Sequence, residues 1–446
     1  MASDVPLPQA PPCCTVAAHR LPRLLCSAAR WLALALLATA GETFAETDAA
    51  DPLPIRRQAP STLTLPVLKL QPSPKYWERN RMFQGIPTIE HTKGGRLWAS
   101  WYAGPLTEGN EGTFIVLVTS GDDGKTWSRP VAVCDDTTFF DGKTWDPRLW
   151  IGPDGSLWFS TTRTLQGTLE GRATTSWSFR AKNPEDPNTD WVEAVFNGYG
   201  VSLNKPTLLK GGAVLQPIED PAVHDNLAWM ISRDGGHRFR PHATIPTLAD
   251  DRLRRHCEHM LVERKDGSLW MLARAEYGIV QAESTDQGKT WLGYRPFTDK
   301  FGVNTRFHLR KLKSGNLLLV VNDHPKARNN MTALLSEDEG KSWPHKLVLD
   351  ERAAVSYPDA TETDEGVVYV IYDRGRYNLG QQEILFAKIT EADIKAGKLT
   401  GAHSSLKNSI NQLAPYDGGV KRNFEPREYE KQHDAWKQEI AAGGNR

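Results

Sequence analysis

The chain has 446 residues, more than one ordinary domain needs, so we expect either several domains or one large unit built from repeats. Lysine plus arginine and aspartate plus glutamate each number 54, and the resulting net charge of zero argues against a nucleic-acid-binding protein. The 15 tryptophans favour extensive aromatic packing, and tryptophan also stacks on sugar rings, so the composition leans slightly toward a carbohydrate partner.

The first 45 residues are predicted to be a signal peptide. A basic flank precedes an apolar core at Trp31–Ala40 that is too short to span a membrane, and a cleavage site follows that would leave Glu46 first. The pattern predicts export to the periplasm or beyond, with no stable membrane insertion after cleavage; an uncleaved anchor is the alternative. The mature chain would keep only Cys134 and Cys257, and the sequence leaves open whether they form a disulfide.

Residues 46–74 are rich in proline and threonine and are predicted to form a linker or a first edge strand. Residues 75–398 are expected to hold one repeated fold. A turn glycine followed by a short apolar strand recurs there six times, at Gly95, Gly155, Gly212, Gly267, Gly315 and Gly366. The intervals of 48 to 60 residues leave room for about four short strands each, so the region is predicted to be an all-β, six-bladed β-propeller.

A second repeat, an octapeptide of the form Ser-x-Asp-x-Gly-x-(Thr/Ser)-Trp, runs alongside the first. Near-identical copies lie at Ser120–Trp127, Ser284–Trp291 and Ser336–Trp343, and a worn copy lies at Ser232–Phe239. The aspartate is expected to accept hydrogen bonds from backbone N–H groups two residues on, and the glycine to supply left-handed backbone. The tryptophan would hold the turn against a sheet. The segment Asn183–Trp191 also ends in tryptophan and is predicted to be a degenerate copy.

Residues 399–446 are predicted to be a polar C-terminal extension. Residues 389–399 (ITEADIKAGKL) are expected to form a short helix after the last blade strand, and Glu425–Ala442 has helical composition with little apolar face. The sequence therefore predicts a propeller followed by a short, partly helical tail.

The octapeptide resembles the Asp-box of sialidases and related BNR-repeat propellers, and the resemblance extends over about residues 79–388. It implies an enzyme with a tyrosine nucleophile paired with a glutamate, three arginines that hold the substrate carboxylate, and an acidic proton donor. Tyrosine suits an anionic sugar, because a neutral nucleophile is not repelled by the carboxylate. The glutamate is needed to take the phenol proton, since the pKa of tyrosine is about 10. The box itself is expected to be structural.

Tyr357, in VSYPDATETDEGVVYVIYD, resembles the sialidase nucleophile, which precedes a turn and a strand that ends in an acid. The resemblance makes Asp373 that acid, orienting an arginine. The family more often has glutamate there, and a small residue in place of Pro358. The alternative for Tyr357 is a packing role at a strand end.

Glu258 lies 16 residues before Arg274, and one β-hairpin around the Asp266–Gly267 turn would bring both to the same end of a blade. The pair resembles the sialidase glutamate that activates the tyrosine and an arginine that binds the carboxylate. Glu263 is the competing acid, but it is expected near the turn and so toward the other end. For Arg274 the alternative is a salt bridge with a nearby glutamate.

Arg328 follows a proline-bearing loop and precedes a strand that enters an Asp-box, which resembles the sialidase segment with the last carboxylate arginine. Arg306 and Arg310 are its local rivals. A planar guanidinium suits this task because it binds both carboxylate oxygens at once.

The first carboxylate arginine of the family is absent. Sialidases usually carry Arg-Ile-Pro before the first blade strand, whereas here Gly85 precedes Ile86-Pro87. Arg81 and Arg148 are the candidates to replace the arginine. Alternatively, Gly85 makes room for a different or larger substrate.

The proton donor is expected on the loop before the first Asp-box, at Glu108 or Glu111, where the family more often has aspartate. Asp146, at a strand start in TWDPRLW, is the next candidate. No cofactor is expected, and no His/Asp spacing resembles a metal motif. The histidines near these segments are expected to bond to sugar hydroxyls: His256, His259, His308 and His324.

The resemblance thus implies an exported exo-acting glycoside hydrolase. It would release a terminal sialic acid or related acidic sugar from a glycan, with retention, through Tyr357. Two other hypotheses stay open. One is a polysaccharide lyase that acts on uronic acids, with Tyr357 or a histidine as base. The other is a non-catalytic carbohydrate-binding propeller, which the departure at Gly85 favours.

Overall fold

A computed structural model describes residues 64–104, 108, 112–135, 142–165, 174–220, 226–245, 258–298, 303–376 and 382–413. The predicted signal peptide, Glu111, Cys257 and the predicted helix at Glu425–Ala442 lie outside these ranges. Within them the chain is nearly all strand, as predicted. Helix occurs there only as the six-residue α1 (Glu391–Ala396) and as two 3-10 turns at Pro74–Tyr76 and Glu78–Asn80. None of the helices in this part of the chain has the length and apolarity that crossing a membrane demands.

The strands form six antiparallel sheets, which we number as blades 1 to 6 in chain order. Blade 1 contains β1 (Leu68–Leu70), β2 (Phe83–His91), β3 (Leu97–Gly104), β4 (Phe114–Ser120) and β5 (Ala132–Cys134). Blade 2 contains β6 (Gly142–Ile151), β7 (Leu157–Leu165), β8 (Thr174–Ala181) and β9 (Trp191–Tyr199). Blade 3 contains β10 (Thr207–Leu208), β11 (Val214–Asp220), β12 (Asn226–Ser232) and β13 (Arg240–Ile245).

The second half of the chain repeats this plan. Blade 4 contains β14 (Met260–Glu263), β15 (Leu269–Ala275), β16 (Gly278–Ser284) and β17 (Leu292–Pro296). Blade 5 contains β18 (His308–Lys311), β19 (Leu317–Asn322), β20 (Met331–Ser336) and β21 (His345–Asp350). Blade 6 contains β22 (Val355–Glu362), β23 (Val367–Arg374), β24 (Glu383–Thr390) and β25 (Ser405–Gln412).

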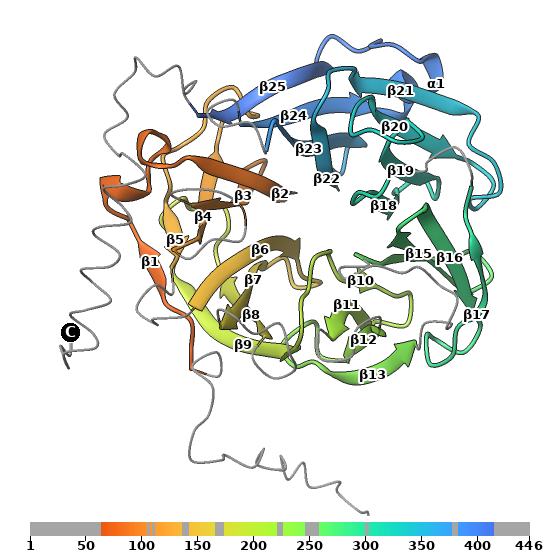
Figure 1. Cartoon of the computed structure of the whole chain (residues 1–446), viewed down its shortest axis with the longest axis horizontal. Helices are drawn as coiled ribbons and strands as arrows, with labels where there is room; N and C mark the ends of the chain where they lie inside the picture. The colour runs from red at the N-terminus through yellow and green to blue at the C-terminus, as the bar shows by residue number, and fades with distance from the viewer. Residues whose placement is uncertain are drawn as a thin grey trace, which may run out of the picture. The chain divides into compact units, whose positions relative to one another are not determined.

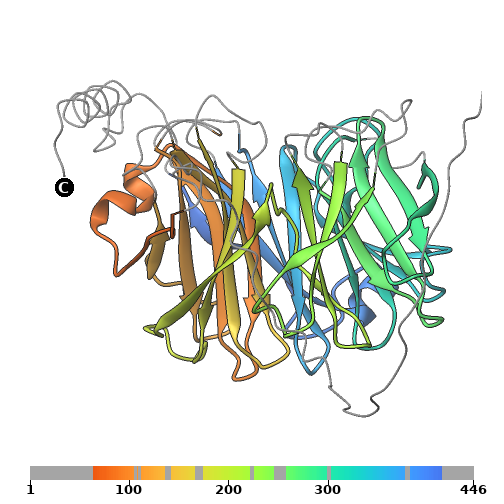
Figure 2. The same cartoon turned by 90° about the horizontal axis from the view of Figure 1, so that it is seen from below.

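The six blades stand in a ring, with the first strand of each four-stranded run nearest the centre and the later strands farther out (Figure 1). Figure 2 shows the ring from the side, with the strands of the blades running between its two ends. The predicted six-bladed β-propeller is thus confirmed. β1 pairs with β5 at the outer edge of blade 1, which is the edge strand expected within residues 46–74.

Each of the six repeated glycines forms the turn between the first two of the four radial strands of its blade. All six have a positive φ, from 79° at Gly366 to 98° at Gly95. Glycine adopts this left-handed conformation without a steric penalty, because it has no Cβ. The second strand begins one or two residues after each of these glycines, as the repeat predicts.

The octapeptides form one kind of turn at the same end of the ring, before the outermost radial strand of blades 1, 3, 4 and 5. In one copy, the Gly340 N–H donates to Ser336 Oγ (2.9 Å) and the Ser342 N–H donates to Asp338 Oδ1 (2.9 Å). The expectation that the aspartate accepts from the N–H two residues on is therefore wrong, because the serine hydroxyl already accepts that bond. The aspartate accepts from the N–H four residues on instead. The worn copy at Ser232–Phe239 makes the same two bonds.

The box glycine is also required by close packing against the preceding blade. Gly340 has a φ of +88°, and a Cβ there would lie 2.6 Å from the Trp270 ring of blade 4. The tryptophan that ends the box packs on a sheet as expected: Trp291 stacks on Trp229 with ring centroids 5.6 Å apart. The predicted degenerate copy at Asn183–Trp191 likewise forms the turn between β8 and β9.

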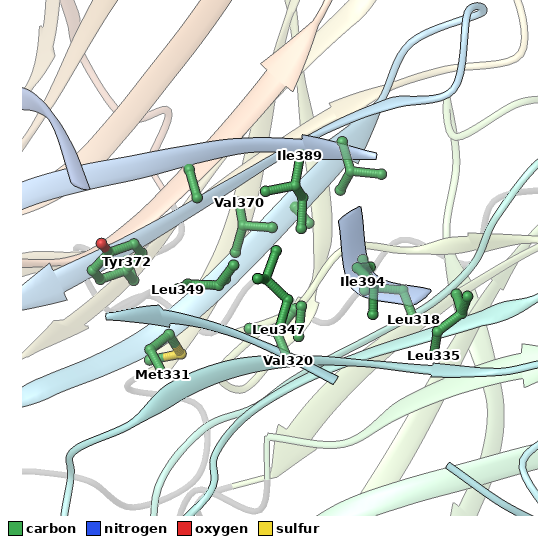
Figure 3. Packing of buried hydrophobic residues seen from close by; sticks show 14 of the residues in the cluster. Leu318, Val320, Met331, Leu335, Leu347, Leu349, Val370, Tyr372, Ile389 and Ile394 are labelled. Atoms are coloured by element: carbon green, nitrogen blue, oxygen red, sulfur yellow. The ribbon is translucent and has the colours of Figure 1, made fainter. Parts of the chain in front are cut away.

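The apolar core lies between neighbouring blades. Figure 3 shows one such cluster, in which Leu318 and Val320 of blade 5 pack with Val370 and Tyr372 of blade 6. Ile394 of the short helix α1 belongs to the same cluster and fixes this predicted helix in place. Because each blade packs against the next in this way, the ring holds the strand ends that carry the site in fixed positions.

Blades 1 and 6 close the ring through side chains, without a shared strand. The Ile86 N–H donates to Asp373 Oδ2 (2.8 Å), and Thr88 Oγ1 donates to Asp359 Oδ2 (2.6 Å). Both bonds join the innermost strand of blade 1 to carboxylates of blade 6. These bonds lie at the innermost strands of the seam, and an apolar cluster that includes Trp101 of blade 1 and Phe386 of blade 6 fills the rest of it.

The last strand lies where the sequence suggests a tail. β25 pairs antiparallel with β24, so the predicted boundary at residue 398 falls inside blade 6. The strand reads SLKNSINQ, and Ile410 is its one buried residue. Such a polar sequence suits an outer-edge strand, but it offers little alternating apolar pattern from which a strand can be predicted.

Candidate active site

Six equivalent positions surround the axis at the end opposite the Asp-boxes. Each lies nine residues before the turn glycine of its blade: Ile86, Asp146, Leu203, Glu258, Arg306 and Tyr357. Four of the six have φ between 46° and 57°, namely Ile86, Asp146, Glu258 and Tyr357. This conformation is rare and strained for bulky residues, and it persists where the surrounding structure fixes it, often at functional sites.

β-Bulges accommodate this conformation in blades 1, 2 and 6. The strand register of blade 6 shifts between Ser356 and Asp359, so Tyr357 and Pro358 stand outside the hydrogen-bonded ladder. A proline is tolerated there because no ladder bond needs its missing N–H. Pro358, which departs from the family pattern, therefore fits the backbone that turns Tyr357 toward the axis.

Tyr357, Glu258 and Arg274 form the centre of the candidate site. Arg274 Nη1 donates to Glu258 Oε1 (2.9 Å) and to the Tyr357 hydroxyl (3.0 Å). Arg274 lies near the end of β15, so the hairpin brings it beside Glu258 as expected. The competitor Glu263 lies at the opposite end, where it accepts a bond from the Lys210 N–H (2.7 Å). The three central side chains are buried.

The Tyr357 phenol is held in its neutral form. Burial, followed by the negative charge of Glu258, raises the pKa of Tyr357 to about 12, although the charges of Arg274 and Arg376 oppose this shift. At neutral pH the phenol therefore needs a base to become a nucleophile. Glu258 Oε2 has no hydrogen-bond partner within the described residues, so this carboxylate oxygen is available to accept a proton.

Three further guanidinium groups face the Tyr357 ring within the described part of the chain. The Cζ atoms of Arg376, Arg328 and Arg306 lie 4.0, 5.5 and 6.0 Å from the ring centroid. Arg306 Nε donates to Asn204 Oδ1 (2.8 Å), and its buried Nη1 has no hydrogen-bond partner among the residues described. Such a concentration of positive charge in a buried site attracts an anion.

Arg376 fills the space beside Gly85. A Cβ at Gly85 would lie 2.4 Å from Arg376 Cδ and 3.0 Å from Asp373 Oδ2. The Arg376 side chain is 1% exposed, with Nη1 3.7 Å from Asp373 Oδ2 and Nε 3.5 Å from Glu108 Oε2. Asp373, predicted to orient an arginine, therefore lies beside Arg376.

The two arginines proposed as replacements at the missing position contact other parts of the protein. Arg148 Nη2 donates to Ser160 Oγ (3.0 Å) and to Gln216 Oε1 (3.1 Å). Arg81 Nη2 donates to Asn411 Oδ1 of β25 (2.9 Å). Both terminal nitrogens of Arg148 donate to protein acceptors that join blades 2 and 3, and its role in binding substrate stays a prediction.

Two of the three candidate proton donors lie at this end of the ring. Glu108 contacts Arg376, and its side chain is 27% exposed. Asp146 is buried at the position in blade 2 that Tyr357 occupies in blade 6. Glu111 is outside the described residues. The geometry therefore leaves the choice of donor open between these acids.

The buried histidines near the site form bonds within the protein. His259 Nε2 donates to Ala228 O (2.8 Å), and His308 Nδ1 lies 3.1 Å from Asp359 Oδ1. Burial lowers the pKa of both rings, that of His259 to about 4. His259 therefore makes a hydrogen bond within the protein, and the bonds of these histidines to sugar hydroxyls stay a prediction. No group of three His, Cys, Asp or Glu side chains in the described ranges is arranged to hold a metal ion.

The sequence analysis does not identify Arg376. It also does not recognise that the six positions nine residues before the turn glycines are equivalent. A signal for the second exists, because counting nine residues back from each turn glycine selects Glu258 and Tyr357 without reference to any family. For Arg376 the signal is weaker. It lies three residues after Asp373, beyond the end of β23.

Comparison with known proteins identifies the family. A family model described as a BNR repeat-like domain matches residues 95–370 of the chain. A sialidase from Bacteroides fragilis (strain YCH46) is 22% identical over 340 residues, which cover 67% of this chain and 52% of that protein. The chain therefore spans about half the length of this curated relative.

Solved structures share the fold. A protein of unknown function from Dyadobacter fermentans DSM 18053 has a TM-score of 0.54 at 18% identity, over 68% of this chain and 93% of that one. An intramolecular trans-sialidase from Ruminococcus gnavus, solved with oseltamivir carboxylate, has a TM-score of 0.56 at 15% identity, over 72% and 97%. Likeness at this level of identity concerns the fold alone. Since the family match spans more than half of the sequence, the chain belongs to the BNR repeat-like domain family, within the sialidase-like BNR-repeat superfamily.

Proposed function

We propose that the protein is an exo-acting glycoside hydrolase of the sialidase type, which releases a terminal sialic acid or related acidic sugar with retention. The observation that carries the proposal is the buried contact of Arg274 with both Glu258 and the Tyr357 hydroxyl, at 2.9 and 3.0 Å. A neutral phenol beside a carboxylate suits attack on an anionic sugar, because the nucleophile carries no charge until the base takes its proton.

In the first step, the Tyr357 oxygen bonds to the anomeric carbon as the bond to the leaving oxygen breaks. The phenol proton passes to Glu258, and the leaving oxygen takes a proton from the acid, for which Glu108, Glu111 and Asp146 are the candidates. In the second step, water bonds to the anomeric carbon and gives its proton to that acid. The tyrosine oxygen leaves and recovers its proton from Glu258. Two inversions at the anomeric carbon give retention.

The sugar carboxylate is proposed to bind Arg274 and Arg328, with Arg306 as a further donor. Arg328 and Arg306 face the Tyr357 ring from blade 5, and Arg274 bonds to its hydroxyl from blade 4. Guanidinium groups bind carboxylates through paired, charge-assisted hydrogen bonds. This placement supports an acidic sugar over a neutral one.

The test is sugar release from aryl glycosides of sialic acid, related ulosonic acids, uronic acids and neutral sugars. Turnover of an acidic glycoside is expected, and Tyr357→Phe should lower kcat by about 10³-fold or more, because the nucleophile is lost while the ring stays. Tyr372→Phe is the control, since this buried hydroxyl contacts Asp350 (3.2 Å) away from the site. Turnover of neutral sugars only, or equal turnover by Tyr357→Phe, would contradict the proposal. An unsaturated product that absorbs ultraviolet light would indicate a lyase instead.

We also propose export, on the strength of the basic flank and apolar core within the first 45 residues. Expression of the full chain in a bacterium with a periplasm should yield a processed protein that begins at Glu46. N-terminal sequencing of the periplasmic fraction checks this. Recovery of only the unprocessed chain would contradict it.

A further inference from the structure

We propose that Arg376 of blade 6 is a ligand-carboxylate-binding residue, and that it takes the space that Gly85 of blade 1 leaves open. The inference rests on the proposed function for the identity of the ligand, an acidic sugar. It adds a binding residue that sequence reasoning does not find. It also assigns Gly85 a role as the residue whose missing side chain admits the guanidinium.

Arg376 occupies the space that a side chain at position 85 would need. A Cβ on Gly85 would lie 2.4 Å from Arg376 Cδ and 2.9 Å from its Cγ, closer than such atoms approach. Gly85 has no positive φ, so its backbone does not demand glycine. The steric need comes from the arginine side chain, which passes over this residue on its way to the Tyr357 ring.

The position of the guanidinium points to a role at the site. Arg376 lies 4.0 Å from the Tyr357 ring centroid, nearer than Arg328 or Arg306. Its charge opposes the rise in the pKa of Tyr357, as does that of Arg274, so both act on the same phenol. Arg376 therefore stands beside the proposed nucleophile, where it can bind the carboxylate of a ligand.

Two carboxylates hold the guanidinium, and they differ in burial. The Asp373 side chain is fully buried and also accepts bonds from Ser356 Oγ (2.6 Å) and the Ile86 N–H (2.8 Å), so it is a fixed support. Glu108 is 27% exposed and stands 3.5 Å from Arg376 Nε. A ligand carboxylate can take the place of Glu108 at Arg376, exchanging one carboxylate for another without leaving the buried cation unpaired.

Binding measured by calorimetry tests the inference without depending on turnover. The probes are N-acetylneuraminate and glucuronate, each compared with its uncharged methyl ester. The wild type should bind at least one acid about ten- to a hundredfold more tightly than its ester, and Arg376→Ala should lose most of that preference. Arg374→Ala is the matched control, because Arg374 ends β23 two residues before Arg376, pairs with Glu383 (2.6 Å) and should leave the preference unchanged.

Gly85→Ala gives a second test that does not remove a buried charge. The added methyl should displace the flexible Arg376 side chain and lower acid binding as Arg376→Ala does, and the double variant should be no worse than Arg376→Ala alone. Thermal unfolding confirms that each variant is folded. An acid preference that is absent in the wild type, or that persists in folded Arg376→Ala or Gly85→Ala, overturns the inference. Acid binding that depends on Arg376, without turnover of any glycoside, would uphold it and refute the proposed hydrolase.

Discussion

The two ends of the propeller are held together in opposite ways. At the Asp-box end, the serine and aspartate that shape each turn bond within one octapeptide, as Ser336 and Asp338 do. At the site end, the partners come from different blades: Arg274 of blade 4 bonds to Tyr357 of blade 6. The repeated octapeptides thus form turns whose defining bonds lie within one short segment. The candidate site, by contrast, depends on contacts between segments that are far apart in the sequence.

The largest expected effect lies at the site end. Glu258→Gln should lower kcat on an acidic glycoside by about 10²- to 10⁴-fold, because the amide cannot take the Tyr357 proton. Steady-state kinetics on the substrate found with the glycoside panel measures it. Glu263→Gln is the matched control, since this glutamate lies at the far end of the same hairpin and should leave kcat within about twofold. Equal loss in both variants would contradict the division between the two ends.

The next effect belongs to the Asp-box end and should be one of stability alone. Gly340→Ala should lower the free energy of unfolding by about 2–4 kcal/mol, because it combines a strained φ of +88° with a clash against Trp270. Gly315→Ala separates the two causes, since its φ is +91° but no atom lies within 4 Å of the added Cβ. Its expected cost is about 1 kcal/mol. Denaturant unfolding gives both values, and kcat of the folded fraction should not change.

A pH effect of similar size is expected from His259, which lies beside the site. Burial lowers the pKa of this ring to about 4, so the folded state favours the neutral form. The resulting stability is fully present above the unfolded pKa of about 6.5 and is lost as the pH falls toward 4, by about 2–3 kcal/mol. Unfolding free energies measured between pH 7.5 and pH 4 should show this loss, and His259→Gln should flatten the profile over that range. An unchanged slope in the variant would rule out His259 as the cause.

The smallest effect tests whether the boxes act independently. Ser336→Ala and Ser232→Ala each leave a glycine N–H without its acceptor and should cost about 1–2 kcal/mol. The double variant should show the sum, because the two turns share no partner. A double-variant change in unfolding free energy that differs strongly from the sum would show that the two boxes are energetically coupled. Such coupling would contradict the contrast with the site.

The same contrast explains which parts of the fold can be predicted from the sequence. The blade count follows from glycines and octapeptides, since each signal is complete within a few residues. β25 is the exception, because an outer-edge strand with one buried side chain, Ile410, takes its structure from pairing with β24. A strand or turn can therefore be predicted where a short segment determines its own conformation. It cannot be predicted where pairing with a neighbouring strand determines that conformation.

At the site, the predicted neighbours Glu258 and Arg274 lie together because a single hairpin connects them. The place of Arg376 cannot be derived in this way. It depends on a missing side chain at Gly85, at the other end of the propeller sequence, and on a ring that has closed. The bond from Arg148 to Gln216 of blade 3 cannot be predicted from local spacing for the same reason.

Closure of the ring without a shared strand has a consequence for biosynthesis. Gly85 and Ile86 are translated early, whereas Tyr357, Asp373 and Arg376 are translated near the end of the propeller. The Ile86 N–H can meet its acceptor on Asp373 only after the chain has been translated through β23 of blade 6, and contacts between such distant segments form late because loop closure is costly. We therefore expect Gly85, Tyr357 and Arg376 to come together only late in synthesis, after most of the propeller has been translated.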